Sequence, residues 1–140
     1  MKIEPGPWRK VGEVSLGRDG KLLMPDPGNR PGIYRFRLTG DNVPSVYIGE
    51  SEGLSRRFGQ YRNPEPSQRT NVRIHNRMLE HLKAGGIVAV AVAVVTAAVL
   101  RVGESQEPLD LHRTTSRRLV EEHLLGEARE AGTEIVENIS

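Results

Sequence analysis

The chain contains no cysteine, and aromatic residues make up only 4% of its 140 residues. Without cysteine, neither a disulfide framework nor a cysteine-ligated zinc site can form. A chain of this length usually forms one domain around one core, and here that core has to be mainly aliphatic. The N-terminal stretch MKIEPGPWRKVGEV lacks the apolar segment of a secretory signal, so we expect a cytoplasmic protein.

Hydrophobic runs are short, and one uncharged segment stands out. It is AGGIVAVAVAVVTAAVL, residues 84–100, and its 17 residues reach only the lower limit for a membrane-spanning helix. Valines at positions 88, 90, 92 and 94 alternate with alanines at 89, 91 and 93. This period of two predicts a buried strand with a small-residue face that a helix can approach closely. We therefore expect no membrane contact.

Neither sign of charge dominates, since the formal net charge is +2, but 16 of the 20 basic residues are arginine. The segment 56–77 contains six arginines and a single acidic residue, Glu65, whereas the last twenty residues are net acidic. A planar guanidinium matches phosphate oxygens in pairs, which the point charge of lysine does not. The local basic block indicates an anionic partner at one face, with a solvated helix surface as the alternative.

The pattern of apolar and turn residues predicts an α+β fold, with a small central antiparallel or mixed sheet flanked by helices. The expected elements are a hairpin at 8–24, a rigid proline-rich connector at 25–31, strands at 32–38 and 45–49, helices at 51–62, 69–86 and 110–131, the Val/Ala strand, and a short tail strand from 134. We expect residues 1–30 to form an N-terminal hairpin extension with its connector, and residues 31–140 to form the main domain.

Several familiar sites are absent from the sequence. There is no GxxxxGKS phosphate loop, no GxGxxG and no serine in a nucleophile elbow. His75 and His81 are six residues apart and would point to different sides of their helix, so they do not form a zinc-binding pair.

Two short triplets remain, GIY at 32–34 and YIG at 47–49, separated by twelve residues. They are followed by ESEGLSRRFGQY at 50–61, with an arginine at 57 and a tyrosine at 61, and much later by LVEEHLL at 119–125. In this order and spacing, the sequence resembles the GIY-YIG nuclease superfamily from about residue 31 to residue 138. The resemblance implies a GIY-YIG-like catalytic domain over residues 31–140.

The resemblance also implies a catalytic role for five residues. Tyr34 would act as general base on the attacking water, and Tyr47 on the neighbouring strand would support or orient it. Arg57 would bind the non-bridging phosphate oxygens, and Tyr61 stands where many members carry histidine or tyrosine. Glu121, rather than the adjacent glutamate, aligns with the family's metal ligand and would hold one divalent cation, Mg²⁺ or Mn²⁺.

These groups suit phosphodiester hydrolysis, which needs a base, charge neutralisation at phosphorus and help for the leaving oxygen. A phenol has an ordinary pKa near 10, so Tyr34 needs a nearby cation to ionise. The guanidinium fork of Arg57 suits the charge of the transition state. One carboxylate with waters and a substrate phosphate is a usual Mg²⁺ arrangement. The hypothesis requires Glu121 to lie on the same side of the sheet as the two phenols.

The remaining basic residues and one asparagine are expected to bind nucleic acid. Arginines are expected to contact the backbone without reading sequence, so binding should weaken steeply with salt. The residues are Arg56, Arg62, Arg69, Arg73 and Arg77, together with Asn138 as the match to the family's asparagine. One departure from the family is Glu50, where many relatives have lysine. It would either shift substrate preference or simply face solvent.

Three functions stay open. The first is a metal-dependent endonuclease acting on DNA, including branched or damaged DNA, with RNA not excluded. The second is a restriction-type enzyme with sequence preference, and the third is a nucleic-acid-binding module without turnover. Structural roles are the alternative for single residues: sheet packing for the tyrosines, a solvated Arg57, and Arg117 as an ordinary i,i+4 partner of Glu121. The oligomeric state is left open.

Overall fold

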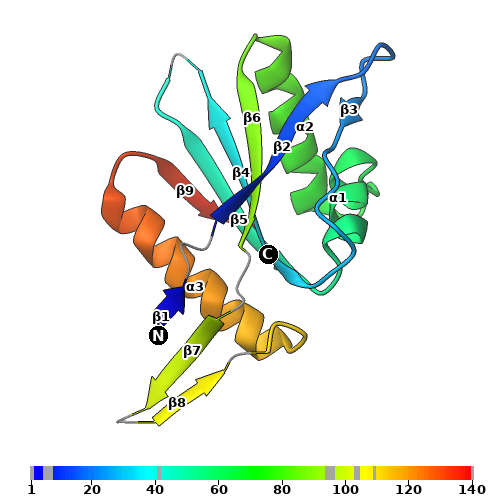
Figure 1. Cartoon of the computed structure of the whole chain (residues 1–140). Coiled ribbons are helices and arrows are strands. Elements are labelled where there is room, and N and C mark those ends of the chain that lie inside the picture. The colour runs from blue at the N-terminus through cyan, green and yellow to red at the C-terminus, as the bar shows by residue number, and fades with distance from the viewer. Residues whose placement is uncertain are drawn as a thin grey trace.

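A computed structural model of the chain describes residues 2–4, 8–40, 42–93, 97–102, 105–108 and 110–139. Figure 1 shows one large twisted sheet, with α1 and α2 on one face and α3 on the other. The helices are α1 (Leu54–Arg62), α2 (Arg69–Lys83) and α3 (Thr114–Ala131). The strands are β1 (Lys2–Glu4), β2 (Trp8–Leu16), β3 (Leu22–Leu23), β4 (Gly32–Thr39), β5 (Ser45–Ser51), β6 (Ile87–Ala93), β7 (Ala97–Val102), β8 (Ser105–Pro108) and β9 (Ile135–Asn138).

The large sheet has the strand order β3-β2-β6-β4-β5-β9. Adjacent strands in this sheet are antiparallel, except β5 and β9, which run parallel. β5 and β9 pair from Ser45 with Ile135 to Ile48 with Asn138. The expected α+β fold with a central mixed sheet is therefore confirmed. The β9 ladder ends at Ile48, so no strand in the described part of the chain pairs with that edge of β5 at residues 49–51.

Alternation along the central strands divides the core into two layers. On β4, Tyr34, Phe36 and Leu38 point to the layer beneath α1 and α2, where the helices contribute Phe58, Ile74 and Met78, among others. The other layer lies beneath α3, and its buried residues are Ile33, Val46, Ile48, Ala93, Val120, Leu124 and Leu125. Tyrosine and phenylalanine are concentrated in the first layer, so the few aromatic residues of the chain gather on one side.

The Val/Ala segment forms two strands, not one. β6 covers residues 87–93 and lies between β2 and β4, with Val88, Val90 and Val92 in the α1/α2 layer and Ala93 against α3. β7, at 97–102, belongs to a separate three-stranded sheet with β1 and β8. The prediction of one continuous strand was wrong because periodicity does not show where a strand leaves its sheet. None of the helices in the described part of the chain is long and apolar enough to cross a membrane.

The N-terminal hairpin joins the large sheet. β2 pairs antiparallel with β6 from Trp8 to Val14 and turns back into β3, as the sequence predicts. Residues 24–31 form neither helix nor strand. Because β2 is an integral strand, the first thirty residues contribute directly to the sheet. The division of the chain at residues 30 and 31 stays a prediction.

Candidate active site

A pair of hydrogen-bonded phenols lies at the centre of the α1/α2 layer. The hydroxyl oxygens of Tyr34 on β4 and Tyr61 on α1 are 2.6 Å apart, and both residues are 0% exposed. Their rings meet edge to face at 5.8 Å, with Phe36 and Phe58 packed against them. The rings are therefore fixed by packing, and their hydroxyls are held together in a site of low polarity.

The two glycines of the triplets make this packing possible. Tyr34 and Gly49 are register partners on β4 and β5, and a Cβ on Gly49 would lie 2.6 Å from Cζ of the Tyr34 ring. A Cβ on Gly32 would lie 3.1 Å from Cδ1 of Leu54 at the start of α1. Glycine is required at position 49 because any side chain there would displace the Tyr34 hydroxyl. The mirrored triplets thus reflect one contact, in which the tyrosine of the first lies over the glycine of the second.

Arg57 completes the group, which we call the Tyr–Arg cluster (Tyr34, Tyr61 and Arg57). The guanidinium is half-buried and lies close enough to both phenols to interact with them electrostatically. Burial would lower the pKa of Arg57, but its interactions with Tyr34 and Tyr61 raise it above the ordinary value, so Arg57 is charged. Tyr47 lies on the same face, opposite Phe36 in the β4–β5 register and 7% exposed. The cluster therefore combines a fixed positive charge with two positioned hydroxyls.

Burial raises the pKa of Tyr34 well above 10, and the neighbouring Tyr61 adds to this while Arg57 opposes it. Burial likewise raises the pKa of Tyr61, against the lowering effect of its hydrogen bonds to Tyr34 and Arg57. Both phenols are therefore protonated at neutral pH in the free protein. Sequence reasoning about Tyr34 as a base did not anticipate how strongly burial opposes its ionisation.

This burial predicts a pH dependence of stability. The unfolded chain releases phenolic protons near pH 10, whereas the folded protein retains those of Tyr34 and Tyr61 to higher pH. The stabilisation is complete below about pH 10 and is lost as pH rises further, at about 1.4 kcal/mol per pH unit for each phenol. Urea unfolding of wild type and Tyr34→Phe between pH 8 and 11 should show a shallower decline for the variant. Equal slopes would contradict the buried, neutral Tyr34.

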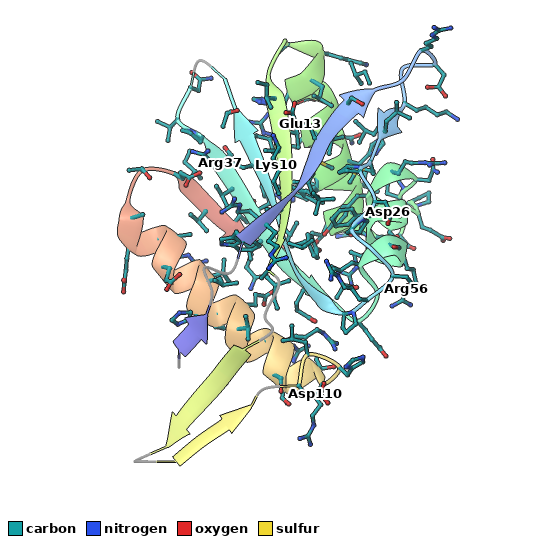
Figure 2. The ribbon with its side chains drawn as sticks, in the orientation of Figure 1. Lys10, Glu13, Asp26, Arg37, Arg56 and Asp110 are labelled. Atoms are coloured by element: carbon teal, nitrogen blue, oxygen red, sulfur yellow. The ribbon has the colours of Figure 1, made fainter. Side chains whose placement is uncertain are left out.

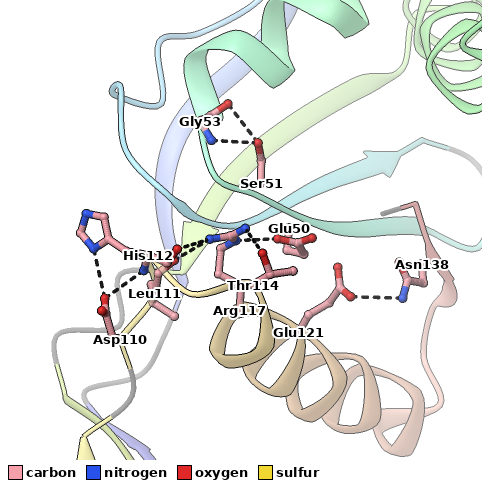
Figure 3. Close-up of polar contacts among 10 residues, drawn as sticks. All are labelled: Glu50, Ser51, Gly53, Asp110, Leu111, His112, Thr114, Arg117, Glu121 and Asn138. Atoms are coloured by element: carbon pink, nitrogen blue, oxygen red, sulfur yellow. Dashed lines mark hydrogen bonds and ion pairs between the residues drawn. The ribbon is translucent and has the colours of Figure 1, made fainter.

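Glu121 and Asn138 form a second group, the Glu–Asn pair, beneath the other face of the sheet. Glu121 is 3% exposed on the sheet-facing side of α3, and Nδ2 of Asn138 on β9 donates to its Oε1 at 3.3 Å. Figure 3 shows Glu121 rising from α3 toward β5 beside Asn138. Asn138, which the sequence predicts to bind nucleic acid, thus lies beside the candidate metal ligand, and its role in binding stays a prediction. However, α3 packs against the face opposite to α1 and α2, so the requirement that Glu121 share a side with the phenols is not met.

Near the end of β5, neighbouring residues in the chain belong to the two opposite faces of the sheet. Gly49 has no side chain and lies beneath the Tyr34 ring, while its neighbour Ile48 is the register partner of Asn138. Beyond Ile48 no described strand covers the β5 edge. The expectation of one site on one face thus becomes two groups on opposite faces of the sheet near the end of β5. Sequence reasoning could not anticipate this, since it depends on which face α3 covers.

Glu50, the departure from the family pattern, neither lines the phenol site nor faces solvent. Its Oε2 accepts a hydrogen bond from Nε of Arg117 at 2.6 Å, and the two side chains are 12% and 4% exposed. The alternative that Glu50 simply faces solvent is wrong, whereas an effect on substrate preference stays a prediction. Arg117 pairs with Glu50 instead of serving only as a helical neighbour of Glu121. Ser51 also differs from expectation: it ends β5 and bonds to Gly53, and α1 begins at Leu54 without a side-chain cap.

The predicted nucleic-acid-binding arginines lie on α1 and α2. Arg56, Arg62, Arg69 and Arg73 are exposed and Arg77 is half-buried, with Arg56 visible on α1 in Figure 2. A groove of about 520 Å³, the α2 groove, is lined by Pro66, Arg69, Val72, Arg73, Asn76, Arg77 and Glu80. Its three arginines are spaced four residues apart and so share one side of the helix. The structure gathers these three and separates them from Arg56 and Arg62 on α1.

Glu137 is a residue that sequence reasoning missed. It lies on β9 opposite Tyr47 in the register and accepts hydrogen bonds from both terminal nitrogens of Arg73, at 3.1 and 2.5 Å. The acidic C-terminal tail therefore reaches the α2 groove. No local pattern predicts a pair between residues that far apart in the chain.

The donor set tests whether a divalent cation fits. Within the described residues, no three His, Cys, Asp or Glu side chains come together in a way that could hold a metal. Mg²⁺ commonly binds through one or two carboxylates and keeps several waters. A buried carboxylate with an adjacent amide, as at Glu121 and Asn138, is compatible with such a hydrated ion.

Comparison with known proteins identifies the fold. No protein-family model matches the sequence, and no curated protein matches it significantly. The strand order and the flanking helices form a GIY-YIG-like fold. Among solved structures, a glutamate-to-alanine mutant of bacteriophage T4 EndoII is similar, with a TM-score of 0.59 and 15% sequence identity over 87% of each chain. This likeness confirms the fold expected from the GIY and YIG triplets.

Proposed function

We propose that the protein is a metal-dependent endonuclease that hydrolyses DNA phosphodiester bonds. The observation that carries the proposal is the Tyr–Arg cluster beside Gly49, in a fold shared with the endonuclease EndoII. A structural core has little use for a charged guanidinium on two buried hydroxyls, because burying a charge is costly. Binding and cleaving a phosphodiester gives that charge a function.

In this proposal, the scissile phosphate binds near the end of β5 and is reached by both the Tyr–Arg cluster and the Glu–Asn pair. Arg57 binds non-bridging oxygens and stabilises the charge that grows in the transition state. Tyr34 accepts the proton of the attacking water, and Tyr61 holds its hydroxyl in place. Because burial raises the pKa of Tyr34, the phenol first has to release its own proton to solvent, which the charge of Arg57 favours, before it can accept the proton of the attacking water. Tyr47 supports the Tyr34 strand from β5.

Glu121 would hold the cation, Mg²⁺ or Mn²⁺, and Asn138 would orient the carboxylate through its side-chain amide. When bound, such an ion neutralises phosphate charge and stabilises the leaving oxygen. Because Glu121 lies on the α3 side, the single-face site expected from the sequence is given up, and the proposal instead requires a substrate that reaches both faces near the end of β5. The phenols and Arg57 would activate the attacking water and bind the phosphate oxygens. The carboxylate of Glu121 would hold the cation on the opposite face of the sheet.

The proposed DNA contacts are the α2 groove and the arginines of α1. They supply affinity for the phosphate backbone without base recognition. Specificity for branched or damaged DNA, or for RNA, is tested by competition among these substrates and does not follow from the arginines alone.

The test is cleavage of supercoiled plasmid by the purified chain with Mg²⁺ or with EDTA. Nicked and linear products that appear only with the metal are the expected result. Ends mapped at many positions support a nonspecific endonuclease, whereas ends at one repeated sequence would favour the restriction-type enzyme. DNA binding in a gel-shift assay with no cleavage under any divalent metal would overturn the enzyme in favour of a binding module.

A prediction about DNA affinity follows from Glu137, which forms an ion pair with Arg73 in the α2 groove. The substitution Glu137→Gln should tighten binding of a DNA duplex by up to about fivefold, because an exposed ion pair is weak and phosphate can replace its anion. The dependence on salt should steepen by about one unit of slope. Fluorescence anisotropy at several salt concentrations measures both.

The matched control is Glu134→Gln. Glu134 pairs with Arg37 at 2.6 Å, so this variant removes the same charge from the same tail but frees an arginine on β4. Its affinity should change less than that of Glu137→Gln. Equal effects of the two variants would show that only net charge matters and would contradict a contact at Arg73.

A further inference from the structure

Arg117 makes more directed contacts than a simple helix residue needs. Its Nε donates to Glu50, one terminal nitrogen donates to the carbonyls of Leu111 and His112 at 2.9 and 3.0 Å, and the other donates to Oγ1 of Thr114 at 3.1 Å. Every guanidinium nitrogen is therefore engaged, and the residue is only 3% exposed. Figure 3 shows these contacts between β5, the loop before α3 and the first turn of α3.

These contacts fix the start of α3 by an unusual route. The N-cap residue, Arg113, makes no side-chain cap, so the first turn lacks the local hydrogen bond that often holds a helix start. Arg117 instead ties that turn and its preceding loop to Glu50 on β5. Glu121 follows Arg117 by four residues and so projects from the same side of the helix.

The position of Glu50 on β5 indicates what the Glu50–Arg117 ion pair does. Glu50 directly follows Gly49, over which the Tyr34 ring lies, and it points to the α3 side with Val46 and Ile48. One ion pair thus joins the strand end beside the Tyr–Arg cluster to the helix turn before Glu121. Buried ion pairs are poor at adding stability, since desolvation offsets their attraction, so a positional role is the better explanation for keeping one here.

We propose that the Glu50–Arg117 pair is a positioning pair, which sets the location of Glu121 relative to the end of β5 and thereby its affinity for the divalent cation. The inference rests on the proposed function, because it takes Glu121 as the metal ligand. Neither Glu50 nor Arg117 touches the substrate in this scheme. Both act through the helix that carries the ligand.

The test measures metal binding separately from catalysis and from folding. The double variant Glu50→Leu/Arg117→Met replaces the pair by apolar side chains, a change that often leaves stability intact while removing the directed contacts. Mn²⁺ binding to the purified chain, followed by the electron paramagnetic resonance signal of free Mn²⁺, should weaken by about tenfold, in the range found for residues that orient metal ligands. Thermal unfolding followed by circular dichroism should give a Tm close to that of the wild type.

A second variant and a control keep the proposal falsifiable. Arg117→Lys keeps the charge but not the fork, so it should also weaken Mn²⁺ binding, and it serves if the double variant does not fold. The control Arg37→Met/Glu134→Leu removes another ion pair that ties distant segments, and its Mn²⁺ affinity should equal that of the wild type. Unchanged Mn²⁺ affinity in a folded Glu50→Leu/Arg117→Met or Arg117→Lys variant would overturn the positioning role.

The Mn²⁺ titration distinguishes a failure of the positioning inference from a failure of the proposed metal site. If Glu121→Gln abolishes Mn²⁺ binding while the pair variants bind normally, the positioning inference fails and the metal site stands. If Glu121→Gln binds Mn²⁺ as the wild type does, the metal site of the proposed function fails, and the inference fails with it.

Discussion

Glu121→Gln is expected to lower metal-dependent cleavage of supercoiled plasmid by about 10³-fold. Glutamine has the shape of the carboxylate and can still accept the hydrogen bond from Asn138, but it lacks the charge that would hold the cation. Losing the metal's stabilisation of the transition state removes several kcal/mol, and each 1.36 kcal/mol corresponds to about tenfold in rate. The measurement is the initial rate of nicking with saturating Mg²⁺.

Glu122→Gln is the matched control for this prediction. Glu122 is the adjacent residue on α3 but is exposed, whereas Glu121 is buried against the sheet. The control removes the same charge from the same helix turn, so its rate should stay within about twofold of the wild type. Comparable losses in the two variants, with circular dichroism spectra unchanged, would mean that Glu121 has no special part in the reaction.

Arg57→Ala is expected to lower the cleavage rate by about 10²- to 10³-fold at saturating DNA, the range seen when a single group that stabilises the transition state is removed. The physical reason is that Arg57 is half-buried and stays charged beside the two phenols, so a positive charge is already present where negative charge grows on phosphate. Single-turnover cleavage, with enzyme in excess over plasmid, measures the chemical step.

The neighbouring arginine provides the control. Arg56 precedes Arg57 on α1 but is exposed, so Arg56→Ala should weaken DNA binding while leaving the single-turnover rate at saturation nearly unchanged. A fall in the saturated single-turnover rate for Arg56→Ala as large as that for Arg57→Ala would show that Arg57 has no special part in the chemical step. Retained activity of Arg57→Ala at saturation would remove the guanidinium from the catalytic scheme.

Much of the fold could be predicted because its signals are local. Alternating residues predict the central strands, and the 3.6-residue period of Ile74 and Met78 predicts α2. The residues of the Tyr–Arg cluster were singled out by the resemblance to the GIY-YIG superfamily. Their contacts span a single hairpin, where Tyr34 meets Gly49, and one helix turn, between Arg57 and Tyr61. Residues that are close along the chain have few possible arrangements, so local patterns predict much of the secondary structure.

The rest depends on contacts between distant segments. The partners of Glu50 and Arg73 are 67 and 64 residues away, and a solvated charge and a paired one look alike in a sequence. Likewise, the sequence does not show that β6 of the large sheet ends at Ala93 and that β7 belongs to the separate three-stranded sheet.

The sequence alone determined the α+β pattern, which follows from periodicity, and its resemblance to the GIY-YIG superfamily singled out Tyr34, Arg57 and Tyr61. The contact of Gly49 with the Tyr34 ring was seen only in the structure. Only the tertiary structure decided that α3 carries Glu121 to the opposite face and that Glu50 binds Arg117. The face that a late helix covers is set by burial of its apolar side against whichever layer remains open, and that depends on the packing of the whole chain.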